Sequence, residues 1–294
     1  TEACEYTNSF HSFFPTTEVV LNVKADHLDF FKDLDDIRNS FRTYTHLLPE
    51  HGSLVINGEI DDLDFFTEGL PCKVLTFGLH GDFDLTARNI SYNTAYPSYD
   101  LYCAGEYICP VTLHIPGEHN VYNSLAALAV CQSLGMDLIK AAECMEHFHG
   151  VDRRFQFKGS LGGVTVIDDY AHHPDEIQAT LSAATDLPHR KLWVVFQPHT
   201  YTRTQAFLPE FAQALSEADH VVLAEIYAAR EKNELGISSA DLQKLIQEKG
   251  VPCEYFPTFD EIENFLLENC TDGDVLITMG AGDVVNIGNS LLGL

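Results

Sequence analysis

Two short segments of the chain combine aspartate, histidine, tyrosine and arginine in a pattern that suits the binding of an anion or a nucleotide. They read Asp168-Asp169-Tyr170-Ala171-His172-His173-Pro174 and Gln197-Pro198-His199-Thr200-Tyr201-Thr202-Arg203-Thr204. Arg153 and Arg154 precede the first segment, and arginine pairs with phosphate through two parallel hydrogen bonds. Two adjacent histidines do not easily face one metal ion. We therefore interpret both segments as hydrogen-bonding groups for a substrate or nucleotide, not as a zinc site.

Two other polar segments are open to both a functional and a structural interpretation. Residues 22–29 (Asn-Val-Lys-Ala-Asp-His-Leu-Asp) follow an apolar strand, the position at which open α/β sheets bind ligands. Their imidazole and carboxylates could hold a divalent cation or orient a phosphate, and a helix-capping turn is equally consistent with them. Asn120 and Asn123 lie on one face of a predicted helix start. They suit a base edge or a phosphate-linked cation, although capping by one of them is the commoner role.

Glycine-rich phosphate-binding patterns are weak or missing. Gly280-Ala281-Gly282-Asp283 resembles half of a dinucleotide fingerprint, but Val285 occupies the place of the third glycine, which favours a tight strand–helix turn. The pattern Gly-x4-Gly-Lys-Ser/Thr does not occur in the sequence, and neither does any Gly-Lys dipeptide. The sequence by itself therefore contains no loop that could cradle a triphosphate.

The composition limits the class of partner. Among 294 residues, 44 Asp and Glu outnumber 17 Lys and Arg, which gives a formal charge of −27. A surface this negative repels nucleic acids and anionic membranes, so an anionic substrate must bind locally, at the few arginines. The 8 cysteines are scattered without a Cys-x-x-Cys pair, as expected for buried thiols in a reducing compartment. We find neither a signal peptide nor an apolar run of membrane-spanning length, so we expect a cytoplasmic protein.

These polar groups need a scaffold, and the second half of the chain predicts one clearly. Apolar strands are expected at residues 164–168, 192–197, 220–226, 252–256 and 275–279. Helical apolar spacing lies between several of them, as in Ile177, Leu181 and Ala184. Apolar strands separated by helices indicate a parallel sheet that is covered on both faces. We predict an α/β domain of dinucleotide-fold type.

The first half is less regular. We expect strands at residues 19–23, 53–57 and 73–77, helices at 35–48, 119–134 and 138–148, and β-type alternation over 82–115. We place the domain boundary at Gly150, which gives domains 1–150 and 151–294. The chain opens without methionine and enters a motif almost at once, so we expect that residues upstream are missing.

Taken in order, the motifs resemble those of the Mur ligase family, ATP-dependent amide-bond-forming enzymes of peptidoglycan precursor synthesis. The resemblance runs from Glu2 to nearly the last residue. It rests on Glu2-Ala3-Cys4-Glu5 with Ser9-Phe10, Asn22 with Asp26-His27-Leu28-Asp29, Gly117-x-His119-Asn120-x-x-Asn123, Arg153-Arg154-Phe155, residues 168–174, residues 197–203, and Gly280-Ala281-Gly282-Asp283. Within the family the motifs are most similar to those of enzymes that join L-alanine to UDP-N-acetylmuramate through an acyl phosphate.

The resemblance implies an α/β fold with a central domain for ATP and magnesium and a C-terminal domain for the amino acid. The chain would be a fragment, inactive alone: residues 1–150 as a mostly parallel, incomplete central domain without its phosphate loop, and residues 151–294 as the whole C-terminal domain. It also implies ATP and Mg²⁺ as cofactors, with Mn²⁺ as a possible substitute, and UDP-N-acetylmuramate and L-alanine as partners.

Individual roles follow from the same resemblance. Glu2 and His27 match magnesium ligands, and Asn120 and Asn123 match residues on the adenine side of the nucleotide. In the C-terminal domain, the family residues that reach the phosphates and ribose of the nucleotide are matched by Arg154 and Asp169. The family positions near the amino acid and the acyl phosphate are matched by Tyr170, His172 and Arg203. Of these, Arg154, His172 and Arg203 are the expected catalytic residues.

The sequence departs from the family pattern at two places, and two alternatives stay open. Thr200 replaces an arginine found in several relatives, which leaves Arg203 as the only cation of its loop. Arg42 stands near the place of a lysine that several wider-family ligases carbamylate, so we do not expect carbamylation. The alternatives are a ligase that recycles a murein tripeptide and a non-catalytic nucleotide-binding module.

The predicted boundary can be tested by limited proteolysis. Because each domain should hold its own core, cleavage near Gly150 should leave a stable fragment of roughly 140–150 residues, an ordinary domain size. Mass spectrometry of the fragments checks this prediction. Cuts that fall mainly inside residues 164–280 would place the boundary elsewhere.

Overall fold

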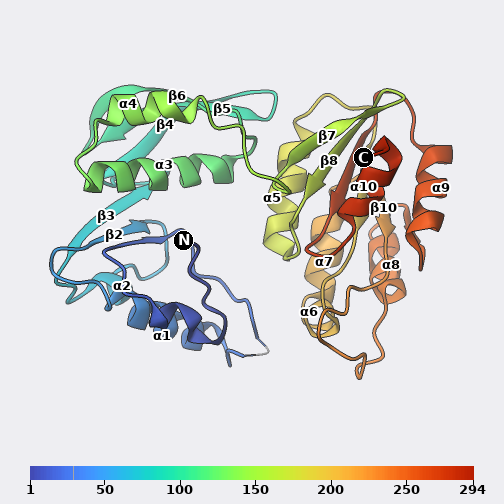
Figure 1. Cartoon of the computed structure of the whole chain (residues 1–294), viewed down its shortest axis with the longest axis horizontal. Helices are drawn as coiled ribbons and strands as arrows, with labels where there is room; N and C mark the ends of the chain where they lie inside the picture. Colours follow the sequence, from blue (N-terminus) through green and yellow to red (C-terminus); the bar gives the residue numbers. More distant parts are fainter. Residues whose placement is uncertain (29) are drawn as a thin grey trace. The chain divides into compact units, whose positions relative to one another are not determined.

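The computed structural model describes residues 1–28 and 30–294, so Asp29, the last residue of the motif after the first strand, lies outside the described residues. The chain divides into two compact units (Figure 1). The first contains Thr1–His114 and Glu118–Phe148, and the second contains Ile115–Gly117 and His149–Leu294.

The first unit is built on a six-stranded sheet in simple sequential order. Its strands are β1 (Thr17–Val20), β2 (Ser53–Asn57), β3 (Lys73–Gly78), β4 (Leu85–Asn93), β5 (Tyr96–Cys103) and β6 (Glu106–Thr112). Strands β1 to β4 pair in parallel, whereas β4, β5 and β6 form an antiparallel meander. The β-type alternation predicted over residues 82–115 corresponds to this meander.

Among its described residues, the first unit contains one 3-10 helix and four α-helices. They are the 3-10 helix η1 (Tyr6–Ser12) and the α-helices α1 (Leu34–Thr45), α2 (Asp64–Thr67), α3 (Glu118–Ser133) and α4 (Leu138–Met145). Helix α3 packs on strands β1 to β4 and buries Val121, Leu125 and Leu128. Asp33 begins α1 by accepting a hydrogen bond from the Asp36 amide, a standard N-cap.

The second unit holds a six-stranded sheet in the order β11-β10-β9-β12-β8-β7. Its strands are β7 (Gln156–Leu161), β8 (Val164–Asp169), β9 (Leu192–Phe196), β10 (His220–Leu223), β11 (Cys253–Tyr255) and β12 (Val275–Met279). All neighbours pair in parallel except β7, which is antiparallel to β8. The helices are α5 (Pro174–Thr185), α6 (Tyr201–Ala206), α7 (Leu208–Leu215), α8 (Ser239–Glu248), α9 (Phe259–Asn269) and α10 (Val285–Leu292).

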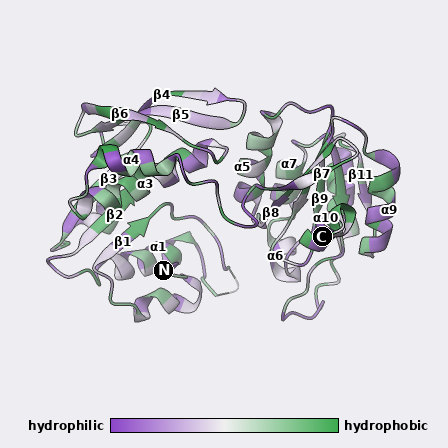
Figure 2. Cartoon of the chain, turned by 45° about the horizontal axis from the view of Figure 1, so that its top comes forward, coloured by the Kyte–Doolittle hydropathy of each residue, from purple (hydrophilic) through white to green (hydrophobic). Residues whose placement is uncertain are grey.

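Strand β9 shows why this sheet needs helices on both sides. Leu192, Val194 and Phe196 belong to a core cluster with residues of α5, α7 and α8, whereas Trp193 and Val195 belong to a second cluster with residues of α9 and α10. Alternate side chains of a strand point to opposite faces, so a fully apolar strand must be covered twice. Figure 2 shows hydrophobic colours along these strands and a mixture of hydrophobic and hydrophilic colours along α9, as expected for an amphipathic helix.

The order of the strands also creates a point of reversal. The chain steps from β8 to β9, β10 and β11 in one direction, and β12 then returns to lie between β8 and β9. Ligands of open α/β sheets bind at the carboxyl ends of strands where the order reverses. The ends of β8, β9 and β12 therefore form the natural position for a site in this unit.

The predicted α/β class, with a mostly parallel sheet in each part, is confirmed. In the second unit, the sequence pattern did not predict the antiparallel edge strand β7 or the helices α6 and α7 between β9 and β10. In the first unit, it did not predict the short helices η1 and α2. None of the helices in the described part of the chain is both long enough and apolar enough to cross a membrane.

Glu18 is an unusual feature of the first core. Its side chain lies on the same face of β1 as the core residue Val20, is only 2% exposed, and has no hydrogen-bond partner for either oxygen among the described residues. Burial raises the pKa of Glu18 to about 8. Burial, together with nearby Glu18, also raises the pKa of Tyr44 on α1 and of Cys72 before β3. At neutral pH the folded unit therefore holds Glu18 mainly in its protonated form.

The stability of the first unit should fall as the pH rises. In the unfolded chain Glu18 ionises at its ordinary pKa of 4.5, while the folded unit keeps the proton until about pH 8. The stability that protonated Glu18 contributes to the folded unit is fully present below pH 4.5 and is lost progressively as the pH rises to about 8. The Glu18→Gln variant cannot ionise at this position, so its melting temperature should rise relative to the natural chain across this window.

Scanning calorimetry at several pH values measures this difference. Trp193, the single tryptophan of the chain, lies in β9, so its fluorescence identifies the transition of the second unit and separates it from that of the first. Glu68→Gln removes the same charge from an exposed side chain and controls for net charge. A constant difference between the Glu18→Gln variant and the natural chain at every pH would contradict the prediction.

Candidate functional site

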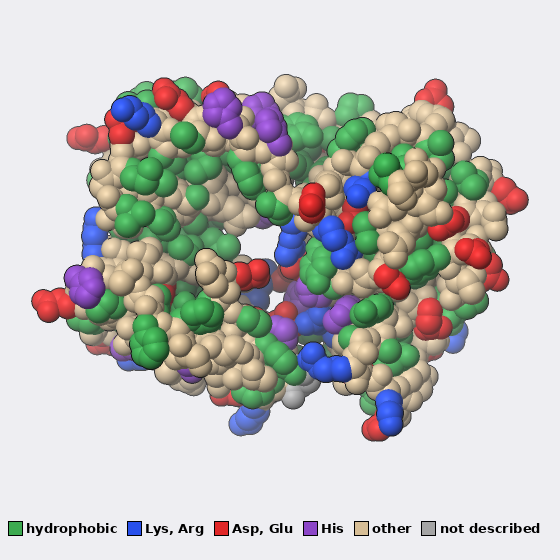
Figure 3. All heavy atoms as spheres, in the orientation of Figure 1, with side chains coloured by type: hydrophobic (Ala, Val, Ile, Leu, Met, Phe, Trp, Pro, Cys, Tyr) green, Lys and Arg blue, Asp and Glu red, His purple; other side chains and the backbone are tan. Residues whose placement is uncertain are grey.

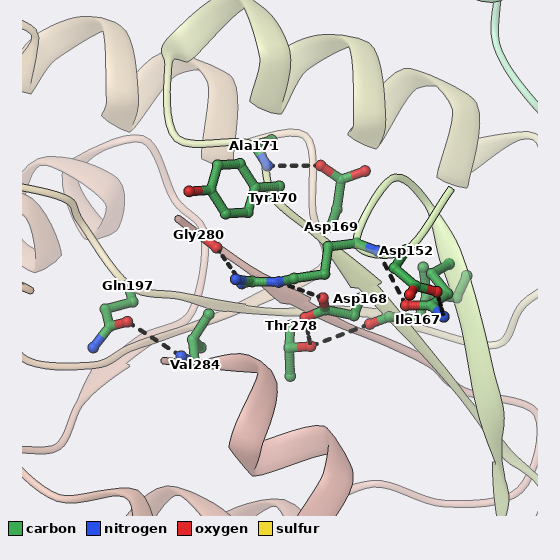
Figure 4. A network of polar contacts seen from close by, with 12 residues as sticks. Asp152, Ile167, Asp168, Asp169, Tyr170, Ala171, Gln197, Thr278, Gly280 and Val284 are labelled. Atoms are coloured by element: carbon green, nitrogen blue, oxygen red, sulfur yellow. Dashed lines mark hydrogen bonds and ion pairs between the residues drawn. The ribbon is translucent and has the colours of Figure 1, made fainter. Parts of the chain in front are cut away.

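Arg153 ties together two of the three strand ends that meet at the reversal of the second sheet. These are the ends next to Asp168 and Gly280, which are labelled in Figure 4. Arg153 Nε donates to Asp168 Oδ2 at 3.1 Å, and its Nη2 donates to the Gly280 carbonyl at 2.7 Å. Thr278 Oγ1 donates to Asp168 Oδ1 at 2.6 Å from β12. Asp168 has a fully buried side chain, and both of its oxygens accept a hydrogen bond. Arg153 and Asp168 therefore form the internal frame of the site.

Asp169, the next residue of β8, shapes the loops beside this frame. Its Oδ1 accepts from the Ala171 amide and its Oδ2 from the Phe155 amide, each at 2.7 Å. Arg153 and Phe155 both have positive φ, which is costly for residues other than glycine, and these hydrogen bonds help to hold them there. Burial raises the pKa of Asp169 to about 6, although the two amides and Arg154 act to lower it.

The neighbouring arginines differ in what they contact. The Arg153 side chain is a quarter exposed, whereas that of Arg154 is half exposed and lies 3.7 Å from Glu176 Oε1. Both guanidinium groups lie over the ring of Tyr170, at 4.7 Å for Arg153 and 5.6 Å for Arg154. Arg154 therefore offers its charge at the surface, where an anionic ligand can reach it.

An aromatic cluster lies in the loops that follow β8 and β9. The His172 ring lies 5.5 Å from Tyr170 and 5.8 Å from His199, and His199 stacks on Tyr227 at 5.6 Å. Burial, followed by the charges of His172 and Arg203, lowers the pKa of His199 to about 4, so this imidazole is neutral at physiological pH. Its Nδ1 is buried and has no hydrogen-bond partner among the described residues.

Gln197 explains the glycines of the last motif. Its Nε2 donates to Asp283 Oδ1 at 2.8 Å, and its Oε1 accepts from the Val284 amide at 3.2 Å. A Cβ atom at Gly282 would lie 2.3 Å from Gln197 Oε1, and Gly280 has a φ of +146° next to the Gln197 backbone. The Gly-Ala-Gly-Asp segment is therefore a tight turn from β12 toward α10, closed by the side chain of the residue that directly follows β9.

In the first unit, three potential metal ligands meet after β1. Ligand atoms of Glu5, Asp26 and His27 all lie within 4.8 Å of one another. His27 Nε2 is 3.5 Å from Glu5 Oε1 and 3.9 Å from Asp26 Oδ2, and the Asp26 carboxylate also accepts from the His27 amide at 2.6 Å. Two carboxylates with one imidazole suit a hard divalent cation such as Mg²⁺ or Mn²⁺. Glu2, the carboxylate predicted from the sequence, is exposed.

The two predicted asparagines also lie in the first unit. Asn120 and Asn123 occupy the start of α3, and Asn123 Nδ2 donates to Asn120 Oδ1 at 3.0 Å. Asn120 Nδ2 contacts His119 Nε2 at 3.1 Å. Both amides therefore lie on one face of the helix, as their spacing predicts.

The structure thus groups the predicted residues within each unit. Arg154, Asp169, Tyr170 and His172 lie together in the second unit, and Arg203 follows in α6. On the face shown in Figure 3, several basic side chains of the second unit gather, whereas acidic ones are scattered over both units. The individual roles predicted from the sequence did not include Glu5, Asp26, His199 or Tyr227, although the segments that contain Asp26 and His199 were interpreted as possible ligand-binding segments. Only Tyr227 lies outside every motif, and its position follows from the pairing of residue 199 with residue 227.

The different environments of Arg153 and Arg154 generate a prediction. Arg153→Ala leaves the buried Asp168 carboxylate with Thr278 as its one remaining side-chain partner among the described residues. Losing one partner of a buried ion pair costs about 3–5 kcal/mol, and somewhat less here because Arg153 is partly exposed. Arg154→Ala removes an exposed pair worth about 0–1 kcal/mol. Urea unfolding followed by Trp193 fluorescence measures both values.

A double variant provides the control. Adding Asp168→Asn to Arg153→Ala removes the unpaired charge and should restore part of the lost stability. Equal effects of the two arginine substitutions would show that Arg153 is not the internal frame of this unit.

Comparison with known proteins agrees with the two-unit organisation. Residues 6–131 match the Mur ligase middle domain, and residues 153–282 match the glutamate ligase domain of Mur ligases. The UDP-N-acetylmuramate–L-alanine ligase of Lachnospira eligens is 54% identical over 293 residues, and that of Clostridium novyi is 44% identical over 292. Both alignments cover 99% of this chain and 64% of the relative, so the chain spans somewhat less than two thirds of these relatives.

Solved structures give the same family. The UDP-N-acetylmuramate–alanine ligase of Thermotoga maritima matches with a TM-score of 0.79 and 28% identity, over 97% of this chain and 61% of the other. A murein peptide ligase of Psychrobacter arcticus matches with a TM-score of 0.69 at 23% identity, over 97% and 58%, which establishes the shared fold only. With both of its units matched to successive domains of one family, the chain belongs to the Mur ligases.

Proposed function

We propose that this chain is part of an ATP-dependent ligase that joins L-alanine to the carboxylate of UDP-N-acetylmuramate in peptidoglycan precursor synthesis, in the cytoplasm. The observation that carries the proposal is the identity of 44–54% with relatives named for that activity, over almost the whole chain. We assign residues 1–150 to the ATP-binding central domain and residues 151–294 to the amino-acid-binding domain. The phosphate loop would belong to the part of the relatives that the chain does not span.

The proposed reaction has two steps. The carboxylate first attacks the γ-phosphorus of ATP, which forms an acyl phosphate and releases ADP. The amine of L-alanine then attacks the acyl carbon, and the amide bond forms as inorganic phosphate leaves. Both steps concentrate negative charge on oxygen atoms, so they need preorganised cations and hydrogen-bond donors.

The arrangement of the second unit supports this assignment. Arg154 offers a half-exposed guanidinium beside the Tyr170 ring, a suitable group for the acyl phosphate or the nucleotide phosphates. His172 and Arg203 would bind the amino acid and stabilise the oxyanion of the second step. Asp169, whose oxygens both accept backbone amides, would act chiefly by shaping the loop that carries Tyr170 and His172.

In the first unit we assign Asn120 and Asn123 to the base side of ATP and Glu2 and His27 to the magnesium ion. A bound Mg²⁺ would neutralise the charge of the phosphates. Glu5 and Asp26 lie beside His27, so Glu5 competes with Glu2 as the carboxylate ligand.

The activity of a ligase extended upstream to the length of its relatives tests the proposal. Phosphate release in the presence of ATP and UDP-N-acetylmuramate should depend on L-alanine, and a tripeptide should not replace it. The chain by itself should be inactive and should bind Mg-ATP weakly. Each charge-assisted hydrogen bond of the missing loop is worth about 1.5–3 kcal/mol. If only the tripeptide stimulates phosphate release, L-alanine is not the substrate. If titration calorimetry finds micromolar Mg-ATP affinity for the isolated chain, the prediction of weak ATP binding is wrong.

The same assay separates the two candidate carboxylates. Glu2→Ala should lower kcat by about 100-fold or more, because the charge of the γ-phosphoryl group is then poorly neutralised. His27→Ala should lower kcat less at high Mg²⁺, and should lose more of any advantage gained with Mn²⁺. Glu5→Ala is the matched variant. If it lowers kcat more than Glu2→Ala does, Glu5 is the ligand.

A further inference from the structure

Glu59 joins three segments of the first unit that are distant in sequence. It follows β2, and its Oε1 accepts from the amides of Leu79 and His80 at 2.6 and 2.8 Å, just after β3. Its Oε2 accepts from the hydroxyl of Tyr122, on the first turns of α3, at 2.8 Å. One carboxylate therefore links the ends of two neighbouring parallel strands to the start of a helix.

Glycines make room for this link. A Cβ atom at Gly78 would lie 2.9 Å from Glu59 Oε1 and 2.5 Å from the ring of Phe83, and one at Gly58 would lie 2.2 Å from the same ring. The backbone at the ends of β2 and β3 can therefore approach the Glu59 carboxylate and the Phe83 ring closely. A larger residue at either position would displace them.

The charges of the pair favour a strong hydrogen bond at neutral pH. Burial acts to raise the pKa of Glu59, but its hydrogen bonds with His80, Tyr122 and Leu79 outweigh burial and lower it. Burial and the Glu59 carboxylate raise the pKa of Tyr122. An ionised acceptor thus faces a neutral donor, the arrangement in which a charge-assisted hydrogen bond is strongest.

Tyr122 stands between the two asparagines in sequence. Asn120 and Asn123 lie one on each side of it, and Val121 and Ser124 are buried. The core contacts of α3 hold its buried side, whereas the hydroxyl of Tyr122 fixes the first turn against the edge of the sheet. Loss of that bond should loosen the exposed side of the turns that carry both asparagine amides.

We propose that the Glu59–Tyr122 hydrogen bond positions Asn120 and Asn123 for the base end of the nucleotide. The inference rests on the proposed function, in which these asparagines bind the adenine side of ATP. Glu59 and Tyr122 are positioning residues here, since they act through the asparagines. Loss of an interaction that binds substrate and transition state equally raises KM and leaves kcat unchanged, and this is the effect expected for these two residues.

Tyr122→Phe in the extended ligase is the direct test. It removes one hydroxyl and keeps the ring. We expect KM for ATP to rise about fivefold to tenfold, as for the loss of one hydrogen bond, with kcat within about twofold and KM for L-alanine unchanged. Glu59→Ala should raise KM for ATP further. Glu59→Gln, which keeps one carbonyl acceptor, should rescue part of the effect.

Tyr99→Phe is the matched control. The Tyr99 hydroxyl bonds to Ser124 Oγ at 2.8 Å, so this variant also removes a single hydrogen bond to α3, but on its buried side. Tyr99→Phe should lower the melting temperature at least as much as Tyr122→Phe and leave KM for ATP unchanged. If both variants change KM for ATP equally, Tyr122 supports only the stability of the helix and the inference is wrong.

Asn120→Ala and Asn123→Ala separate this inference from the proposed function. If they raise KM for ATP and Tyr122→Phe does not, the positioning role fails while the nucleotide assignment stands. If neither asparagine variant alters KM for ATP, the assignment of the base side fails, and the inference fails with it.

Discussion

The buried ion pair between Arg153 and Asp168 is the contact on which the second unit depends most. It is placed where β8, β9 and β12 end together, and it reaches the backbone of Gly280 as well as the Asp168 carboxylate. A charge as buried as that of Asp168 is tolerated only with full hydrogen bonding, which Arg153 and Thr278 supply. The geometry of the neighbouring loops is therefore set by internal electrostatics. The adjacent Arg154 is not part of this buried network, and its guanidinium lies at the surface.

Both units use the same device at the carboxyl edge of their sheets. Asp169 accepts the amides of Phe155 and Ala171, and Glu59 accepts those of Leu79 and His80. In each case a carboxylate at or just after the carboxyl end of a parallel strand accepts hydrogen bonds from backbone amides of adjacent loops. Such bonds are short and directional, so they fix the backbone of these loops in addition to the apolar packing of residues such as Ala171 and Phe155. We regard these carboxylates as organisers of the loops that carry the proposed ligand-binding residues.

The strongly acidic composition gives the few arginines a particular weight. With a formal charge of −27, the chain as a whole repels phosphate-bearing molecules, and attraction must be local. Arg153 is paired with the buried Asp168, whereas the Arg154 side chain is half exposed and lies over Tyr170. Two adjacent residues of the same type thus have different physical roles, which follow from the different environments of their side chains.

The sequence by itself determined the class of the fold, most of the strands and helices, and the segments that line the carboxyl edges of the sheets. Those features follow from the local periodicity of apolar residues and from turn chemistry, which short stretches of sequence encode. Tertiary structure alone decided which of these polar groups meet. Glu5 lies beside His27, Tyr227 stacks on His199, and Tyr122 binds Glu59 across 63 residues. Such contacts depend on the order and register of strands that are far apart in the chain. A local pattern of residue types does not determine that order.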